Sequence, residues 1–331
     1  MKTQVRDWVV GIDIGGTSIV TGIVPRAGGP PRGLRSAPTL PARGVEAVIA
    51  DIVRLVDEAL AEAGLGFDDV AGVGVGCPGP VDRRAGIVSD SPNLGWRDVP
   101  LRSLLEARFS RPVTLENDAN CAIWGEWWQG AGQGSRSVFG VVIGTGVGGG
   151  WISNGELVHG ASDVAGEIGH TTVVLDGRRC ACGNRGCVEA YAGGPSIAAR
   201  AREALASGAS SILVERVAGD LDRLDAATIF AAAADDDPLA KEVVRETARI
   251  LGATAANLVN LVNPDVIVFM GGVSGAGELL FAPLRAEVDA RAFRAAASVC
   301  RIVPGTLGGS AGVVGAAGRF LHAEAHSRVG A

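Results

Sequence analysis

The chain has 331 residues, of which 47% are hydrophobic and 20% are charged, so it can build a sizeable buried core and is not disordered as a whole. The formal net charge of −6 and the lack of a basic run argue against a nucleic-acid partner. No stretch approaches about eighteen uncharged apolar residues, and the first residues do not read as a signal peptide. We therefore expect a cytoplasmic protein with no membrane partner.

The first predicted element is a β-hairpin over residues 8–24, in which two runs rich in β-branched residues flank Gly15 and Gly16. The turn offers bare backbone amides and the Thr17 hydroxyl, which suit phosphate oxygens. Asp13 stands just before the turn, where a carboxylate can hold a hydrated magnesium ion. A glycine turn of this type also occurs as a turn alone, so the motif by itself leaves both interpretations open.

Predicted helices and buried strands alternate in the next hundred residues. The helices cover residues 44–63 and 101–109, where apolar residues recur at helical spacing. The strands cover residues 70–76 and 112–115. Loops are expected over residues 25–43 (with an edge strand), 77–80 and 91–96, which are rich in proline and glycine.

Glu116, Asn117 and Asp118 lie between the last of these strands and a predicted helix over residues 119–129. The loop at the carboxyl end of a strand usually faces a ligand cleft, which favours a catalytic role for Asp118. An aspartate at this position is also a routine helix N-cap. Position alone does not decide between capping and catalysis.

Residues 138–153 repeat the opening pattern, with a strand, a turn at Gly144, Thr145 and Gly146, and a returning strand. Two halves that each begin with a glycine-turn hairpin indicate a duplicated architecture with a nucleotide between the halves. A chance resemblance between two glycine hairpins is the alternative.

Three of the six cysteines, Cys180, Cys182 and Cys187, fall within eight residues, and His170 lies ten residues upstream. Three thiolates and one imidazole are the ligand set of a closed tetrahedral zinc site, which has no position for a reactive water. We therefore expect a structural zinc ion. A redox-active cysteine pair or buried free thiols are the alternative.

Two carboxylates, Glu167 and Glu189, flank this cysteine loop. If a metal fixes the loop, both become preorganised hydrogen-bond acceptors. Polar groups such as sugar hydroxyls would suit them as partners.

The last third of the chain is mostly helical. Helices with apolar stripes are expected over residues 192–206, 237–260 and 277–290, together with an alanine-rich stretch over 226–236. A buried strand over 264–270 runs into Gly271 and Gly272, where a flat ring or a phosphate can approach closely, although an ordinary strand-to-helix turn fits equally well. A strand over 301–303 and a helix over 311–323 follow, and we expect that helix to return to the first domain.

Taken together, these motifs resemble those of the ROK family of sugar kinases and sugar-responsive repressors, over nearly the whole chain. The motifs that carry the resemblance are Asp13–Thr17, Glu116–Asp118, Gly144–Gly150, Glu167–His170 and Cys180–Glu189. It implies an α/β fold of the actin-like ATPase (ribonuclease H-like) class, with two α/β domains and a cleft between them. We expect a small domain of residues 1–118 plus 305–331 and a large domain of residues 119–304.

The resemblance also implies roles for individual residues. Asp118 would be the general base for the sugar hydroxyl. The sugar would contact Gly79, Asn93, Asn117, Asp118, Glu167, His170 and Glu189. ATP with Mg²⁺ would contact Asp13, Gly15, Gly16, Thr17, Thr145, Gly146, Gly271 and Gly272. A structural Zn²⁺ would be bound by His170, Cys180, Cys182 and Cys187.

The implied activity is ATP-dependent phosphorylation of a hexose, with glucose expected first, by a homodimer or homotetramer. N-acetylmannosamine, N-acetylglucosamine, fructose, allose or a cyclitol are alternative substrates. A sugar-sensing repressor is a second hypothesis, but such repressors carry a winged-helix domain ahead of the first glycine turn, and only twelve residues precede Asp13 here. A zinc-loop module that binds a protein partner is a third, and it leaves the two hairpins unexplained.

Overall fold

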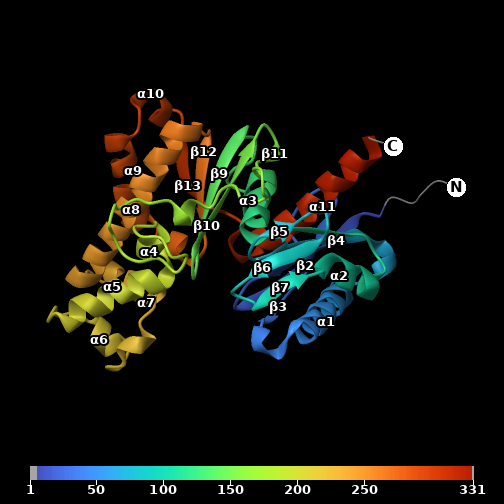
Figure 1. The fold of residues 1–331 in the computed structure, drawn as a ribbon, viewed down its shortest axis with the longest axis horizontal. Helices are drawn as coiled ribbons and strands as arrows, with labels where there is room; N and C mark the ends of the chain where they lie inside the picture. The colour runs from blue at the N-terminus through green and yellow to red at the C-terminus, as the bar shows by residue number, and fades with distance from the viewer. Residues whose placement is uncertain (1–5, 330–331) are drawn as a thin grey trace. The chain divides into compact units, whose positions relative to one another are not determined.

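The computed structural model describes residues 6–329, which fold into two compact units. Residues up to Gly134, Glu156–Ala165 and the residues from Thr306 onward form the first unit, and Ser135–Gly155 and Gly166–Gly305 form the second. Both units are mixed α/β structures (Figure 1). Within residues 6–329, no helix combines the length and the apolar character that crossing a lipid bilayer requires.

The first unit is built on a five-stranded sheet in the order β3-β2-β1-β4-β8. Its strands are β1 (Trp8–Ile14), β2 (Ser18–Pro25), β3 (Arg32–Pro38), β4 (Val70–Cys77) and β8 (Val113–Asn117). The pairs β1–β2 and β2–β3 are antiparallel, whereas β4 runs parallel to both β1 and β8. The predicted opening hairpin and the two predicted buried strands are thus confirmed.

Successive side chains of a strand point to opposite faces of the sheet. Apolar side chains on both faces of this sheet are covered by helices. Val10 and Ile12 pack with α1 (Val45–Ala63) and α2 (Leu101–Phe109) on one face. Val9 packs on the other face with Val313 and Phe320 of α11 (Ala311–Val329). Helix α11 approaches the strands closely, since a Cβ atom placed on Gly74 would lie 1.9 Å from the carbonyl oxygen of Ala316.

A small antiparallel sheet of β5 (Val81–Asp82), β6 (Ile87–Ser91) and β7 (Trp96–Val99) completes the first unit. Only an irregular loop was predicted over residues 91–96, and none of these three strands was predicted. These strands are too short to show a clear alternation, and their pairing depends on the fold rather than on local pattern.

The second unit repeats the strand order of the first, as β11-β10-β9-β12-β13. Four strands of this sheet lie in the second unit, β9 (Ser137–Ile143), β10 (Val147–Ser153), β12 (Val266–Met270) and β13 (Arg301–Pro304). The two-residue edge strand β11 (Glu156–Leu157) begins the segment 156–165, which is grouped with the first unit. Strands β9 and β10 are antiparallel, and β12 is parallel to both β9 and β13. The second predicted hairpin is therefore confirmed.

Most of the remaining helices belong to the second unit and pack into one apolar core. They are α4 (Glu189–Ala192), α5 (Gly194–Ala206), α6 (Leu213–Arg216), α7 (Ala226–Ala234), α8 (Pro238–Val262), α9 (Glu278–Arg291) and α10 (Arg294–Ala297). Short 3₁₀ turns lie at η1 (Pro41–Arg43), η2 (Phe67–Asp69), η3 (Ile168–His170), η4 (Leu221–Arg223), η5 (Gly272–Ala276) and η6 (Gly308–Ser310).

The division into units differs from the expected boundary at residue 118. Helix α3 (Asp118–Gln129) belongs to the first unit, because it packs against α11, β4 and β8. Residues 156–165 also belong to the first unit. A boundary drawn at the end of a strand could not detect these contacts, which join residues far apart in the chain.

Candidate functional site

Two aspartates of the first unit lie near the carboxyl ends of parallel strands. The register pairs Asp13 of β1 with Gly76 of β4, and Cys77 of β4 with Asn117 of β8, so Asp13 and Asp118 reach the same edge of the sheet. Burial, reinforced by the negative charge of Asp118, raises the pKa of Asp13 to about 7. The strand order thus assembles an acidic pair from residues a hundred positions apart.

Asn117, rather than Asp118, is the N-cap of α3. Its side-chain oxygen accepts a hydrogen bond from the backbone N–H of Asn120 at 3.1 Å, while Asp118 is the first helical residue. The capping explanation that the sequence left open for Asp118 is therefore wrong. The Asp118 carboxylate accepts a bond from its neighbour's amide, Ala119 N, at 2.8 Å.

A buried polar cluster lies directly behind this acidic end. Glu116 is 3% exposed and contacts His159 Nε2 at 2.9 Å, Asn120 Nδ2 at 3.1 Å and Arg319 Nε at 3.4 Å. Burial raises the pKa of Glu116, but the bond from His159 and the charges of His159 and Arg319 outweigh it, so the pKa lies below its ordinary value. A second bond, from Asn117 N to Glu116 Oε1, ties the charged cluster to the N-cap.

Glu116 was predicted only as part of a motif, and His159 and Arg319 were not predicted as site residues. Neither of the two missed residues lies in a glycine or cysteine motif. No local sequence signal marked either of them, because only the folded chain brings them to Glu116.

Gly79 and Asn93, expected to contact the sugar, lie near other predicted site residues of the first unit. The carbonyl oxygen of Gly79 accepts a long bond of 3.4 Å from Asn117 Nδ2. Asn93 packs against the glycine turn, since a Cβ atom on Gly16 would lie 3.1 Å from Asn93 Cβ. The small sheet β5–β7, which the sequence did not reveal, supports both of these positions.

The two glycine turns occupy equivalent places in the two units. In the first, Gly15 N bonds Ser18 O at 2.8 Å, and Thr39 Oγ1 donates to Gly15 O at 2.7 Å. Thr17 lies exposed at the tip of this turn. In the second, Gly144 N bonds Gly146 O at 2.9 Å. Both turns are thus held by backbone bonds.

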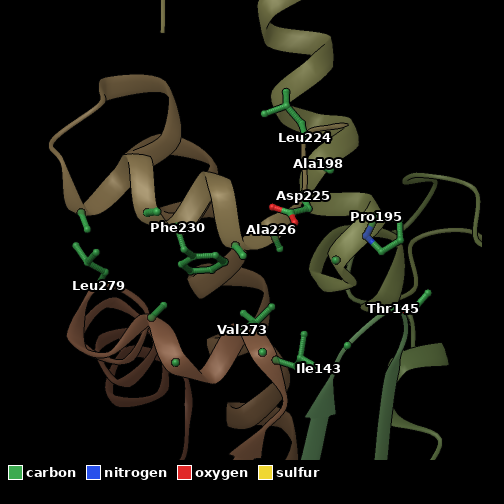
Figure 2. A pocket seen from close by; sticks show the side chains of 18 of the residues that line it. Ile143, Thr145, Pro195, Ala198, Leu224, Asp225, Ala226, Phe230, Val273 and Leu279 are labelled. Carbon is green, nitrogen blue, oxygen red and sulfur yellow. The ribbon is translucent and has the colours of Figure 1, made fainter. Parts of the chain in front are cut away.

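A cavity of about 770 Å³ opens beside the second turn. The lining is mostly apolar and comes from the end of β9, the start of α5, helix α7 and η5 (Figure 2). Phe230 and Val273 are among the lining side chains, and Asp225 supplies a carboxylate. Asp225 caps α7 by accepting a 2.7 Å bond from Thr228 N, and bonds from the hydroxyl and amide of Thr228 hold its pKa below the ordinary value.

Two of the predicted nucleotide-contacting residues, Thr145 and Gly272, line this cavity. Gly271 instead lies against the strand end, where a Cβ atom would be 2.1 Å from Ile143 O. Gly146 faces Glu189, since a Cβ atom there would be 2.5 Å from Glu189 Oε2. The contribution of α7 to the cavity was not predicted, although α7 lies within the alanine-rich stretch over residues 226–236, whose small side chains leave room for a ligand.

The four predicted metal ligands converge in the second unit. One ligand atom from each of His170, Cys180, Cys182 and Cys187 lies within 4.8 Å of all the others. Cys182 Sγ is 3.8 Å from Cys187 Sγ, and Cys180 Sγ is 3.8 Å from His170 Nδ1. Zinc–sulfur bonds of about 2.3 Å in a tetrahedron place the sulfurs about 3.8 Å apart, so this donor set fits a zinc ion.

Glycine backbone geometry makes the cysteine loop tight. Gly183 and Gly186 have φ values of 93° and 71°, in the left-handed region that favours glycine. At Gly186 a Cβ atom would also lie 1.7 Å from Val174 O, so no side chain fits there. Both positions therefore require glycine, which lets the short loop turn its sulfur atoms toward one another.

Glu167 and Glu189 lie on either side of the metal ligands. Glu189 Oε2 accepts a bond from Val147 N at 3.0 Å, and its Oε1 lies 3.7 Å from Cys180 Sγ. Glu167 is exposed and immediately precedes η3, which carries His170. Partial desolvation of its carboxyl group raises the pKa of Glu167, the charge of His170 opposes this rise, and the charge of Glu189 reinforces it. The second unit therefore gathers two acids and an imidazole around the cysteine loop.

The arrangement agrees with comparisons to known proteins. The chain matches the ROK family over residues 9–322. This chain belongs to the ROK family. It is 38% identical to a glucokinase of Halalkalibacterium halodurans, over 93% of each chain. It is 36% identical to a glucokinase of Thermotoga maritima, over 93% of this chain and 96% of the relative.

The solved structures include a ROK family glucokinase from Streptomyces griseus in complex with glucose and AMPPNP. It is 37% identical to this chain, with a TM-score of 0.81 over 94% of this chain and 98% of the other. The expected α/β fold of the actin-like ATPase class is thereby confirmed. The repeated five-stranded sheets of the two units are its two halves.

Proposed function

We propose that the protein is an ATP-dependent glucokinase that transfers the γ-phosphoryl group of ATP to the 6-hydroxyl of glucose. The observation that carries this proposal is the near-full-length similarity to the Streptomyces griseus glucokinase, whose structure holds glucose and AMPPNP. The glucokinases of two further organisms, similar over 93% of this chain, favour the same substrate.

Asp118 serves as the general base in this proposal. It accepts the proton of the sugar hydroxyl as that oxygen attacks the γ-phosphoryl group, and phosphoryl transfer asks the protein mainly for such positioning and charge stabilisation. Two observations support this role: Asp118 directly follows β8, and Asn117 rather than Asp118 caps helix α3. Gly79, Asn93 and Asn117 would then bind neighbouring hydroxyls.

The adenosine of ATP is assigned to the cavity of the second unit. Its volume of about 770 Å³ and its apolar lining suit a purine and a ribose. Gly271 and Gly272 bring the backbone close to the nucleoside, while Gly15, Gly16, Thr17, Thr145 and Gly146 offer amides and hydroxyls to the phosphates. Magnesium bound with ATP would neutralise phosphate charge, and Asp13 is the residue proposed to hold its hydration shell.

A structural zinc ion is assigned to His170, Cys180, Cys182 and Cys187. His170 directs Nδ1 toward the sulfurs, at 3.8 Å from Cys180 Sγ, which leaves Nε2 to hydrogen-bond a sugar oxygen. Glu167 and Glu189 would accept bonds from further hydroxyls, in orientations that the fixed loop maintains. We propose a homodimer as the assembly, which light scattering on the purified chain tests.

The test of the proposed function is an ADP-release assay with ATP and Mg²⁺ across a panel of sugars. The panel contains glucose, N-acetylmannosamine, N-acetylglucosamine, fructose, allose and a cyclitol. We expect the highest kcat/KM for glucose. A higher value for another sugar would reassign the substrate, whereas no ADP release with any sugar would remove the kinase proposal and favour a regulatory protein.

A further inference from the structure

A second group of metal-ligand side chains lies far along the chain from the cysteine loop, in the first unit. Helix α11 carries His322 and His326 four residues apart, a spacing that places both rings on one helix face. Glu156 faces them, with Oε2 at 3.0 Å from His322 Nε2 and Oε1 at 3.7 Å from His326 Nε2. One ligand atom from each residue lies within 4.8 Å of the others.

The hydrogen bonding of His326 leaves the nitrogen that faces Glu156 available as a ligand. His326 Nδ1 lies 2.9 Å from the carbonyl oxygen of His322. Because a carbonyl oxygen only accepts, Nδ1 donates this bond, which leaves Nε2 as the ring nitrogen on the side of the carboxylate. A ring nitrogen donating to a backbone carbonyl while the other faces the metal is the usual arrangement at histidine ligands.

The packing of His322 holds its ring in place. The ring makes an edge contact with Trp124, at 4.8 Å between centroids, and its side chain is only 20% exposed. Glu156 and His326 are 59% and 65% exposed, so an ion can enter from solvent and both side chains can adjust. One fixed ligand and two adjustable ones are enough to close a site around an ion.

We propose that Glu156, His322 and His326 bind a divalent transition metal ion, with Zn²⁺ as the probe that best fits the donors. Two imidazoles and one carboxylate suit Zn²⁺, and they leave a fourth position for water. Bonds of 2.0–2.2 Å in a tetrahedron require donor separations of about 3.4 Å. Glu156 offers one oxygen to each ring, Oε2 at 3.0 Å from His322 Nε2 and Oε1 at 3.7 Å from His326 Nε2, so its carboxylate lies close to both imidazole donors.

The ion would hold residues 156–165 in place, a segment of the first unit that two polar contacts already anchor. Glu156 begins the stretch 156–165, in which His159 bonds Glu116 at 2.9 Å and Asp163 pairs with Arg83 at 2.7 Å. A metal bridge from Glu156 to α11 adds a third tie, at the end of the stretch where the chain enters it. The site therefore stabilises the segment that carries His159, and it does not depend on the proposed kinase activity.

The test compares zinc content in the full-length chain and in single variants. After dialysis against micromolar free Zn²⁺, elemental analysis should find one more zinc ion per chain in the native protein than in Glu156→Gln or His326→Gln. Ser327→Ala, on the same helical turn, is the matched control and should keep the native content. Removing a ligand should weaken this binding by at least about tenfold, as even the loss of a supporting contact does.

Cobalt substitution supplies a second readout that separates the two metal sites. Cobalt bound by thiolates absorbs strongly in the near ultraviolet, whereas cobalt bound by imidazole and carboxylate gives only weak visible bands. His326→Gln should remove only the weak visible bands of the second site, while the near-ultraviolet thiolate absorption and the visible bands of the cysteine site stay. Equal metal content in the native chain and both ligand variants, or binding of the extra ion only at millimolar concentration, would overturn the proposal.

Discussion

The two five-stranded sheets repeat one topology but surround it with different chemistry. Each opens with an antiparallel hairpin on a glycine turn and continues with two parallel strands. In the first sheet an acid, Asp13, stands two residues before the turn glycine, and Val142 holds the corresponding place in the second. The first unit therefore concentrates charge at this edge, while the second opens into an apolar cavity.

The shared topology determines where each site lies, and the side chains determine the chemistry of that site. Both glycine turns follow a central strand, where backbone amides are exposed at the edge of the sheet. In the proposed function, proton transfer at the first edge requires a carboxylate, whereas binding of a purine at the second edge requires small and apolar groups.

The largest effect is expected from replacing the acid of the first edge. Asp118→Asn should lower kcat for glucose by about 10²–10⁴-fold and leave KM nearly unchanged, because a positioned base acts on the chemical step. Steady-state ADP release measures both constants. Asp222→Asn, an exposed acid of the second unit, is the control. A loss of less than tenfold in kcat would show that the first edge contributes no base.

The metal loop of the second unit should come next in size. Cys182→Ser removes the most exposed sulfur ligand, so the surrounding packing changes least. We expect zinc to be lost and the dissociation constant for glucose to rise by at least about tenfold, since Glu167 and Glu189 lose their fixed support. Elemental analysis and isothermal titration calorimetry measure the two effects.

Cys300→Ser is the matched control for the metal loop, because this partly exposed cysteine lies outside the ligand cluster. It should keep both zinc and glucose affinity. A Cys182→Ser protein that lost its zinc but bound glucose as tightly as the native chain would separate the metal from sugar recognition. That result would assign sugar binding mainly to residues of the first unit.

A smaller effect should come from the close packing of α11 on the first sheet. Gly74→Ala would place a Cβ atom 1.9 Å from Ala316 O, so either the helix or the strand must move. Overpacking of this kind costs about 1–3 kcal/mol of unfolding free energy. Gly309→Ala, where nothing lies within 4 Å, is the control and should change stability by less than about 0.5 kcal/mol. Urea unfolding compares them, and equal midpoints would contradict the close approach.

Local patterns in the sequence predicted much of this structure. Both hairpins, α1 and β4 were predicted from periodicity and glycine placement, and the four metal ligands came from residue type and spacing alone. These features are determined by neighbouring residues. They can therefore be predicted from short stretches of the sequence without knowledge of the fold.

The features that the sequence did not predict depend on distant contacts. The cluster of Glu116, His159 and Arg319 joins three segments that only the folded chain brings together. The short strands β5–β7 have too few residues for a period to appear. At Asp118 the sequence left capping and catalysis open, because one residue decides where the helix begins, and that residue is Asn117.

The smallest predicted effect concerns pH and again contrasts Asp13 with Val142. The folded-state pKa of Asp13 is about 7, above the ordinary value of 3.8. The folded chain therefore keeps a proton that the unfolded chain has already released between these pH values. Without magnesium or nucleotide, stability should fall as pH rises through this window and level off above it.

Asp13→Asn removes this titration, so the melting temperature of the variant should fall less between pH 5 and pH 8 than that of the native chain, by at least about 2 °C. Calorimetry at several pH values measures it. Asp118→Asn provides an internal check, because removing the neighbouring negative charge lowers the pKa of Asp13 and should end the fall at a lower pH. Parallel melting curves for the native and Asp13→Asn chains would mean that Asp13 is already ionised in the folded protein. The first edge would then carry more negative charge before any cation binds, which would increase its electrostatic difference from the apolar second edge.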